Sequence, residues 1–165
     1  MTLSKMLRLG IGADEIGEDL KQHLVALLQN HPRLQSLREF SFADGEAGCS
    51  YPKVAIRIAQ AIRRGEIDRA VLICGTGIGM CITANKVPGV RAAVGHDSYS
   101  VERSIESNNC QILTLGSRIV APTLAYRLVD EWLSYEFDPQ TPSSVKLEVI
   151  ADFERELQTH GAAGY

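Results

Sequence analysis

The sequence predicts an α/β fold, a Rossmann-like three-layer sandwich in which a five-stranded parallel sheet carries helices on both faces. Two observations predict it. Short apolar runs alternate along the chain with longer segments whose apolar residues recur at helical spacing. A glycine-rich turn, GTGIG at residues 75–79, directly follows one apolar run. Ligands of such sheets bind at the carboxyl ends of the strands, so this turn marks the expected site.

The elements follow from periodicity and from the residues that end each segment. The first expected helix has Leu20, Leu24 and Leu28 on one face and Pro32 beyond its end, and Gly65 ends the second. A turn-rich loop is expected at residues 45–52. The expected strands are residues 6–13, 37–43, 70–75, 91–96 and 111–116, and the expected helices are residues 18–31, 54–65, 80–86, 98–108, 123–137 and 145–158.

The length of 165 residues and the 45% hydrophobic composition are those of one ordinary globular domain. We expect a single domain over residues 1–150, followed by a C-terminal helix and a disordered tail over residues 151–165.

Charge and hydropathy favour a small-molecule ligand. The net charge is only -3, and Lys and Arg are scattered, which argues against nucleic acid and membrane surfaces as partners. No apolar stretch approaches the roughly 20 residues that span a bilayer, and the N-terminus lacks the features of a signal peptide. We therefore expect a cytoplasmic protein.

The four cysteines are expected to be free thiols. Cys49, Cys74, Cys81 and Cys110 show no CxxC spacing, and the four histidines form no familiar ligand pair with them. We expect neither a metal site nor a cofactor.

The glycine turn is read as an anion cradle. Gly75, Gly77 and Gly79 allow backbone N–H groups to face one point, and a following helix adds the positive end of its dipole. The spacing fits neither a Walker loop nor a dinucleotide fingerprint. A tight strand-to-helix turn with Cys74 as a packing residue is the alternative that the spacing alone leaves open.

Longer motifs carry a resemblance to a known family. ICGTGIGM, ANKVPGVRAAVGHDSYS, SNN and ILTLGSRIV resemble, in order and spacing, the ribose-5-phosphate isomerase B and galactose-6-phosphate isomerase family of sugar-phosphate isomerases. The resemblance implies aldose–ketose isomerisation through an enediolate. Cys74 would be the base, the glycine-turn amides would bind the enediolate oxygen, and Thr76 would relay a proton or act as a turn residue.

The same resemblance assigns four further residues to the substrate, each with a plainer alternative. Asp14 would hold a hydroxyl or cap a helix, and Asn108 would bind a sugar oxygen or end a helix. Arg118 would reach phosphate in a neighbouring subunit, or be a surface arginine. Tyr51 would border the substrate as a wall.

The sequence also departs from the family. Glu15, which borders the expected substrate site, and Ser107 replace two histidines, the second of which opens the sugar ring. Thr141 and Val145 replace two phosphate-binding arginines. His96 either replaces the missing ring-opening group or is a strand-end histidine paired with Asp97.

These departures indicate the branch. A tetrose 4-phosphate cannot close into a furanose, so it needs no ring-opening group, and the motifs look most like the D-erythrulose-4-phosphate isomerases of erythritol catabolism. The alternatives are a ribose-5-phosphate isomerase, an isomerase of unphosphorylated sugars or uronates, and an inactive sugar-phosphate-binding subunit. The family also implies a homodimer or homotetramer with sites shared between subunits.

Overall fold

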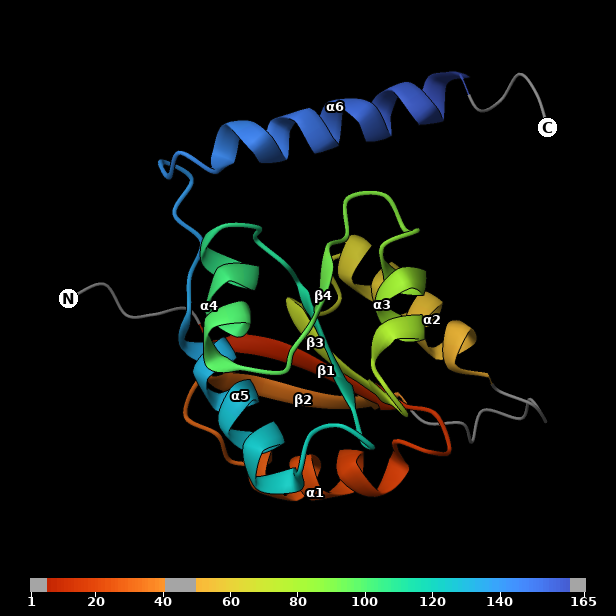
Figure 1. Ribbon diagram of the computed structural model, residues 1–165, viewed down its shortest axis with the longest axis vertical. Helices are drawn as coiled ribbons and strands as arrows, with labels where there is room; N and C mark the ends of the chain where they lie inside the picture. The colour runs from red at the N-terminus through yellow and green to blue at the C-terminus, as the bar shows by residue number, and fades with distance from the viewer. Residues whose placement is uncertain (1–5, 41–49, 161–165) are drawn as a thin grey trace.

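The computed structural model describes residues 6–40 and 50–160. Strands and helices alternate along these residues (Figure 1). The strands are β1 (Leu7–Ala13), β2 (Leu34–Phe40), β3 (Arg69–Cys74), β4 (Ala92–Val94) and β5 (Ile112–Gly116). The helices are α1 (Glu18–Leu28), α2 (Tyr51–Arg63), α3 (Ile78–Ala84), α4 (Ser98–Glu106), α5 (Pro122–Ser134) and α6 (Ser144–His160).

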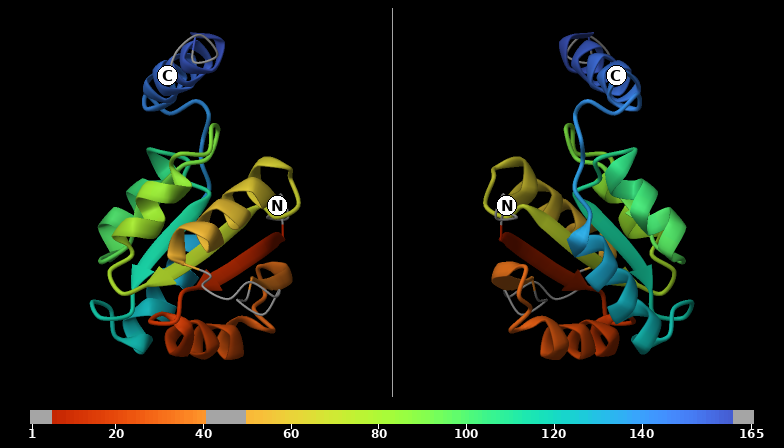
Figure 2. Two further views of the ribbon diagram at one scale, coloured as in Figure 1. Left: turned by 90° about the vertical axis from the view of Figure 1, so that its right-hand side faces the viewer. Right: turned by 90° about the vertical axis from the view of Figure 1, so that its left-hand side faces the viewer.

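The sheet has the order β2-β1-β3-β5-β4, and all four strand pairs are parallel. Helices α1, α4 and α5 pack on one face, and α2 and α3 pack on the other (Figures 1 and 2). Helix α6 lies outside these layers. The predicted Rossmann-like fold class is therefore confirmed.

The element boundaries differ from the predicted ones in several places. Helix α1 ends at Leu28, three residues early, and β2 begins at Leu34, three residues early. Helix α6 begins at Ser144, one residue early, and ends at His160, two residues late. Cys49, the predicted strand residues 41–43, most of the turn-rich loop and the tail at residues 161–165 lie outside the described residues.

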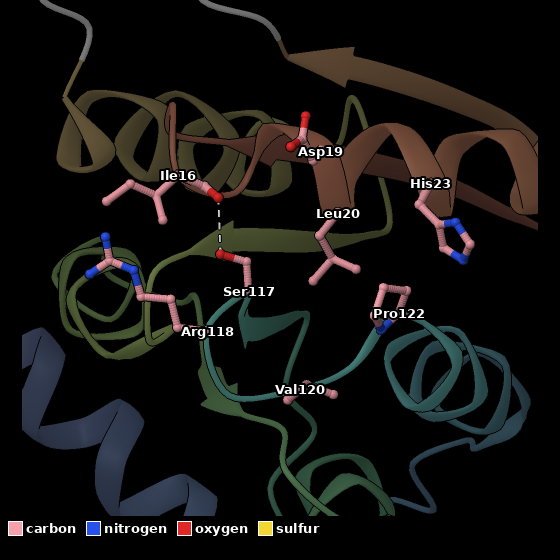
Figure 3. Close-up of a pocket in the computed structure, with 8 residues that line it drawn as sticks. All are labelled: Ile16, Asp19, Leu20, His23, Ser117, Arg118, Val120 and Pro122. Carbon is pink, nitrogen blue, oxygen red and sulfur yellow. Dashed lines mark hydrogen bonds between the residues drawn. The ribbon is translucent and has the colours of Figure 1, made fainter.

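The turns that follow β1, β3 and β5 lie at one edge of the sheet. Ala13 pairs with Ile73, and Cys74 pairs with Gly116, so these strands end side by side. Figure 3 shows that Ile16, after β1, and Ser117, after β5, come into contact there. Three turns distant in sequence therefore meet around the end of β3.

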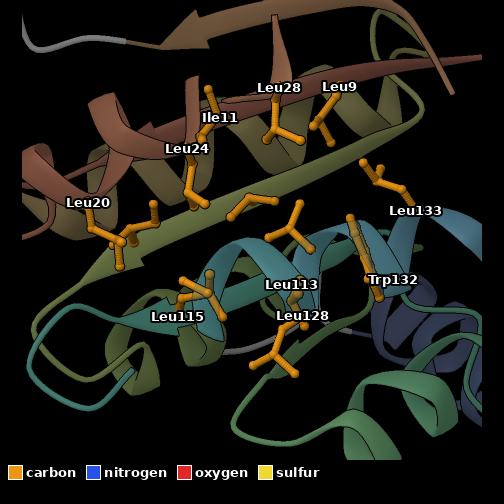
Figure 4. Packing of buried hydrophobic residues seen from close by; sticks show 14 of the residues in the cluster. Leu9, Ile11, Leu20, Leu24, Leu28, Leu113, Leu115, Leu128, Trp132 and Leu133 are labelled. Atoms are coloured by element: carbon orange, nitrogen blue, oxygen red, sulfur yellow. The ribbon is translucent and has the colours of Figure 1, made fainter. Parts of the chain in front are cut away.

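The core is divided between the two faces of the sheet. Val71 and Ile73 of β3 face α1, α4 and α5, whereas Leu72 and Cys74 face α2 and α3. Figure 4 shows leucines of α1 and the sheet packed with Trp132 and the leucines of α5. Because these side chains are buried on both faces, they hold β3 and its terminal cysteine in place.

Candidate active site

Cys74 lies at the last position of the central strand, with only 5% of its surface exposed. Its Sγ accepts a hydrogen bond from the N–H of Gly77 at 3.2 Å. Gly77 has a φ of +79°, and a Cβ there would lie 3.1 Å from the carbonyl carbon of Leu115. Glycine is thus required at this position. The resulting backbone donor fixes the position of the sulfur at the end of the strand.

The glycine turn is shorter than the sequence predicts. Helix α3 begins at Ile78, so Gly79 lies in its first turn, where N–H groups have no intrahelical acceptor. Gly79 makes room for Tyr51, whose Cε2 would lie 2.6 Å from a Cβ at that position. Thr76 is exposed, and its Oγ1 accepts a long hydrogen bond of 3.4 Å from the N–H of Ile78.

Asp14 follows the neighbouring strand β1. Its N–H donates to the carbonyl of Ile73 at 3.1 Å, and its Oδ1 accepts from the N–H of Gly17 at 2.9 Å. Gly17 is the N-cap of α1, so Asp14 stabilises a turn before the helix and is not itself the cap. Glu15 is exposed beside it. The turn carries both carboxylates to the same edge as Cys74.

Arg118 lies beside the glycine turn of its own chain. Its N–H donates to the carbonyl of Gly75 at 3.1 Å, and its Cδ would lie 3.7 Å from a Cβ at Gly75. The side chain is exposed and forms no ion pair with any described residue. It lines a pocket of about 520 Å³ with Ile16, Asp19, Leu20, His23, Ser117, Val120 and Pro122 (Figure 3). A free guanidinium is therefore available to an anion next to Gly75.

His96 follows the outer strand β4 and is exposed. Among the described residues, no hydrogen bond joins His96 to Asp97, the pairing that the sequence left open. The carboxylate of Asp97 caps α4 instead, because it accepts from the N–H of Ser100 at 2.8 Å and also from the Ser100 hydroxyl. These bonds from Ser100 hold the pKa of Asp97 below its usual range.

Asn108 is separated from Cys74 within one chain. It follows α4 and precedes β5, so it lies at the amino edge of the sheet, whereas Cys74 lies at the carboxyl edge. Its Nδ2 donates to the carbonyl of Arg103 at 2.9 Å, in the helix-ending role that was the plainer alternative. Its neighbour Ser107 lies at the same helix end.

A comparison with models of protein families shows to which family this chain belongs. Residues 9–150 match the profile of a family described as Ribose/Galactose Isomerase. The chain belongs to this family. Membership in the ribose/galactose isomerase family makes the protein an aldose–ketose isomerase.

Relatives within the ribose/galactose isomerase family span nearly the whole chain. D-erythrulose-4-phosphate isomerase 2 of Mycolicibacterium smegmatis is 46% identical over 148 residues, covering 90% of this chain and 97% of the relative. Ribose-5-P isomerase B of Listeria innocua is 39% identical over 149 residues, covering 90% and 98%. The solved structure of Clostridium thermocellum ribose-5-phosphate isomerase B is 38% identical, with a TM-score of 0.79 and coverage of 90% and 97%.

Two other features of this family member concern its remaining cysteines and metals. Burial raises the pKa of Cys110 to about 12 and also raises the pKa of Cys81, so neither thiol suits a base near neutral pH. The three described cysteines are free thiols, as predicted.

Within residues 6–40 and 50–160, no cluster of three or more His, Cys, Asp or Glu is arranged to hold a metal ion. No helix in these residues is long and apolar enough to cross a membrane.

Sequence reasoning missed Ser117. Its N–H donates to the carbonyl of Cys74 at 2.8 Å, and its hydroxyl donates to the carbonyl of Ile16 at 3.0 Å (Figure 3). The available signal was its place directly after the strand ILTLG, at the edge where ligands bind.

Proposed function

We propose that this chain interconverts D-erythrulose 4-phosphate and D-erythrose 4-phosphate through an enediolate, with Cys74 as the base. The observation that carries the proposal is the buried Sγ at the end of β3, held by the N–H of Gly77 at 3.2 Å. Helices pack against both faces of this strand, so the sulfur is held rigidly where ligands of parallel sheets bind. A rigidly held sulfur at this position is suited to abstracting a proton from carbon.

The reaction moves one carbon-bound proton. Starting from the ketose, the Cys74 thiolate removes a proton from C1, and the electron pair forms the C1–C2 double bond of the enediolate. N–H groups in the first turn of α3 that have no intrahelical acceptor, such as that of Gly79, stabilise the charge that develops on oxygen. The thiol returns the proton to C2, while the hydroxyl of Thr76 relays the proton that passes between the two oxygens.

The remaining residues bind the substrate. The carboxylate of Asp14 accepts a substrate hydroxyl, Tyr51 forms a wall over Gly79, and Glu15 borders the same edge. Arg118 binds the phosphate, because its guanidinium lies next to Gly75 without a carboxylate partner among the described residues. Arg118 would thus take the role of the two phosphate-binding arginines of the family, at whose positions this chain has Thr141 and Val145. Ser143, Ser144 and Lys146, around the start of α6, are the other candidate donors.

The preference for a tetrose rests on ring chemistry. Ribose 5-phosphate closes into a furanose through its 4-hydroxyl, whereas that oxygen carries the phosphate in a tetrose 4-phosphate. Ser107 stands where the family's ring-opening histidine is expected, which suits a substrate without a ring. The 46% identity to D-erythrulose-4-phosphate isomerase 2 supports the same choice. A place in erythritol catabolism is part of the proposal and follows from the choice of the tetrose.

Ribose 5-phosphate is the second candidate substrate. The relative from Listeria innocua is named for it, and His96 lies at the carboxyl edge, exposed and able to open a ring.

The assembly belongs to the proposal as well. Asn108 lies at the amino edge of the sheet in its own chain, away from Cys74. It can therefore bind the same sugar as Cys74 only in a site completed by a second copy. We therefore include a homodimer or homotetramer with shared sites.

A coupled isomerisation assay tests the function. Purified wild-type protein and the Cys74→Ala variant are given D-erythrulose 4-phosphate and D-ribose 5-phosphate in parallel. The proposal expects a large preference for the tetrose and loss of turnover in Cys74→Ala, with binding of the sugar phosphate retained. A preference for ribose 5-phosphate would make His96 the ring-opening group. Inactivity on both would leave unphosphorylated sugars and uronates as substrates, or a binding subunit.

A further inference from the structure

Ser117 joins two of the turns that carry the proposed machinery. Its N–H donates to the carbonyl of Cys74 at 2.8 Å, in the turn after β3. Its hydroxyl donates to the carbonyl of Ile16 at 3.0 Å, in the turn after β1 that also holds Asp14 (Figure 3). A single residue thus binds the strand end that carries the base and the turn that carries the substrate-binding carboxylate.

The packing around Ser117 sets a lower limit on how closely the turns approach. Gly17 lies so close to the carbonyl of Ile73 that a Cβ would be 2.5 Å from its oxygen. A Cβ on Gly116, next to Ser117, would lie 2.7 Å from the Cα of Thr76. Close contacts prevent the turns from approaching further, whereas hydrogen bonds prevent them from separating. The Ser117 hydroxyl supplies such a bond on the solvent side, since Ile16 is 48% exposed.

The turn that Ser117 holds also fixes the carboxylate of Asp14. Ile16 immediately precedes Gly17, whose N–H donates to Oδ1 of Asp14 at 2.9 Å. Moving the carbonyl of Ile16 would therefore move the donor that orients this carboxylate.

We propose that Ser117 is a positioning residue, whose hydroxyl fixes the Asp14 turn relative to the Cys74 thiol. This inference rests on the proposed function. Proton transfer between carbons requires the base and the substrate at a defined separation, and a misplacement of about 1 Å costs on the order of 100-fold in rate. Ser117 acts on that separation without touching the substrate.

Three variants test the role of the hydroxyl. Ser117→Ala removes the hydroxyl and keeps the backbone N–H, while Ser117→Thr keeps both donors. Ser134→Ala is the matched control, because the Ser134 hydroxyl also donates to a backbone carbonyl, that of Glu131 at 2.6 Å, on an exposed helix end. All three should melt within about 4 °C of wild type, since each loses at most one exposed hydrogen bond.

The kinetic result expected is a loss confined to one variant. Ser117→Ala should lower kcat about tenfold or more, with a smaller change in KM, and Ser117→Thr should restore it. With substrate deuterated at C1, the isotope effect on kcat should rise in Ser117→Ala, because proton transfer becomes slower relative to the other steps. Loss of folded protein alone would lower kcat and leave the isotope effect unchanged.

Hydrogen exchange of the Gly17 amide separates this inference from the proposed function. The N–H of Gly17 should exchange faster in Ser117→Ala than in Ser134→Ala or wild type, whatever the substrate. Unchanged Gly17 protection, or identical kinetics in Ser117→Ala and Ser134→Ala, would overturn the positioning role. If the Gly17 amide exchanges faster in Ser117→Ala but the wild-type protein isomerises no sugar phosphate, the positioning role stands and only the proposed function is contradicted.

Discussion

Two glycines at the carboxyl edge have close neighbours that differ in how easily they can move. A Cβ on Gly17 would lie 2.5 Å from the backbone oxygen of Ile73, which the sheet holds in place. A Cβ on Gly79 would lie 2.6 Å from the ring of Tyr51, which is 41% exposed and can swing into solvent. The same substitution should therefore have different costs at the two positions.

We predict that Gly17→Ala lowers the free energy of unfolding by about 2 kcal/mol or more. Gly79→Ala should leave it within about 0.5 kcal/mol, because alanine favours α3 and offsets the displaced ring. The displaced Tyr51 should instead raise KM. Urea unfolding and steady-state kinetics of the two variants measure these effects, and equal losses of stability would contradict the assignment.

The thiol of Cys110 makes stability depend on alkaline pH. Burial raises its pKa in the folded protein from 9.0 to about 12. Below pH 9 the thiol is protonated in both states, so its contribution is complete. As the pH rises from 9 towards 12, the unfolded chain releases this proton and the folded chain does not, which favours unfolding.

We expect the free energy of unfolding to fall by up to about 1.4 kcal/mol per pH unit above pH 9 from this group. Cys110→Ala should be less stable at pH 7 and should lose less stability between pH 8 and pH 10. Urea unfolding at several pH values gives both slopes, and parallel curves for the two proteins would contradict the prediction. Part of the slope should remain in the variant, because burial also raises the pKa of Cys81.

At the scale of elements, Asn85 completes the outer edge of the sheet. Its Oδ1 accepts from the N–H of Ala92 at 2.9 Å, and its Nδ2 donates to the carbonyl of Ala92 at 2.9 Å. Since β4 is an edge strand, this side chain takes the place of a neighbouring strand at its first residue.

Replacing Asn85 should loosen β4 from α3. Asn85→Ala removes both bonds and should cost about 1–2 kcal/mol. Asn85→Asp keeps the acceptor but sets a carboxylate oxygen against the carbonyls of Ala92 and Cys81, to which Nδ2 donates, so it should cost at least as much. Urea unfolding ranks the two variants, and amide exchange of Ala92 shows whether the loss is local. An Ala92 amide protected as well in Asn85→Ala as in wild type would count against this role.

Arg69 explains where α5 ends. Its guanidinium donates to the carbonyls of Trp132 and Tyr135, at 2.6 Å each, and lies over the ring of Trp132. The periodicity of residues 123–137 predicts a helix that continues to Phe137, yet α5 ends at Ser134. The competing donor comes from β3, distant in sequence, so no local pattern could have indicated it.

We predict that Arg69→Met destabilises the fold by about 3 kcal/mol, because it leaves two carbonyls without their donor. Burial lowers the pKa of Arg69 only to about 10, so the guanidinium is charged at neutral pH and its bonds are charge-assisted. Arg127→Met is the control, since its pair with Glu131 is exposed and should contribute under about 1 kcal/mol. Similar losses in the two variants, measured by urea unfolding, would contradict the role of Arg69.

At the scale of the whole molecule, the sequence indicates the fold more completely than the site. Alternating patterns are local, so five strands and six helices could be expected in order. The contact of Ser117 with Ile16 depends on two turns 101 residues apart, which no spacing reveals. Asn108 is the opposite case. Its motif resembles that of the family and indicates a site residue, yet the fold of one chain separates it from Cys74.

Helix α6 presents an exposed apolar stripe, which indicates how a second chain could bring Asn108 to a site that contains Cys74. Val145, Val149, Phe153 and Leu157 recur at every fourth residue and are 57–64% exposed. On the other side, Leu147 is buried, and Glu154 accepts from the N–H of Gly89 at 2.9 Å. We expect a second copy of the chain to cover the stripe, because water-exposed apolar rows of this length favour association.

Phe153→Glu should convert the assembly to monomers without unfolding the domain, since the side chain contributes little to the core of its own chain. Gln158→Glu places the same charge five residues further along the helix, at an exposed polar position outside the stripe, and should leave the mass unchanged. Light scattering over a range of concentrations measures the mass, and a wild type that is monomeric throughout would contradict the prediction. If Asn108 acts on a neighbouring site, the monomeric variant should also lose isomerase activity, and activity should return wherever the concentration restores the assembly.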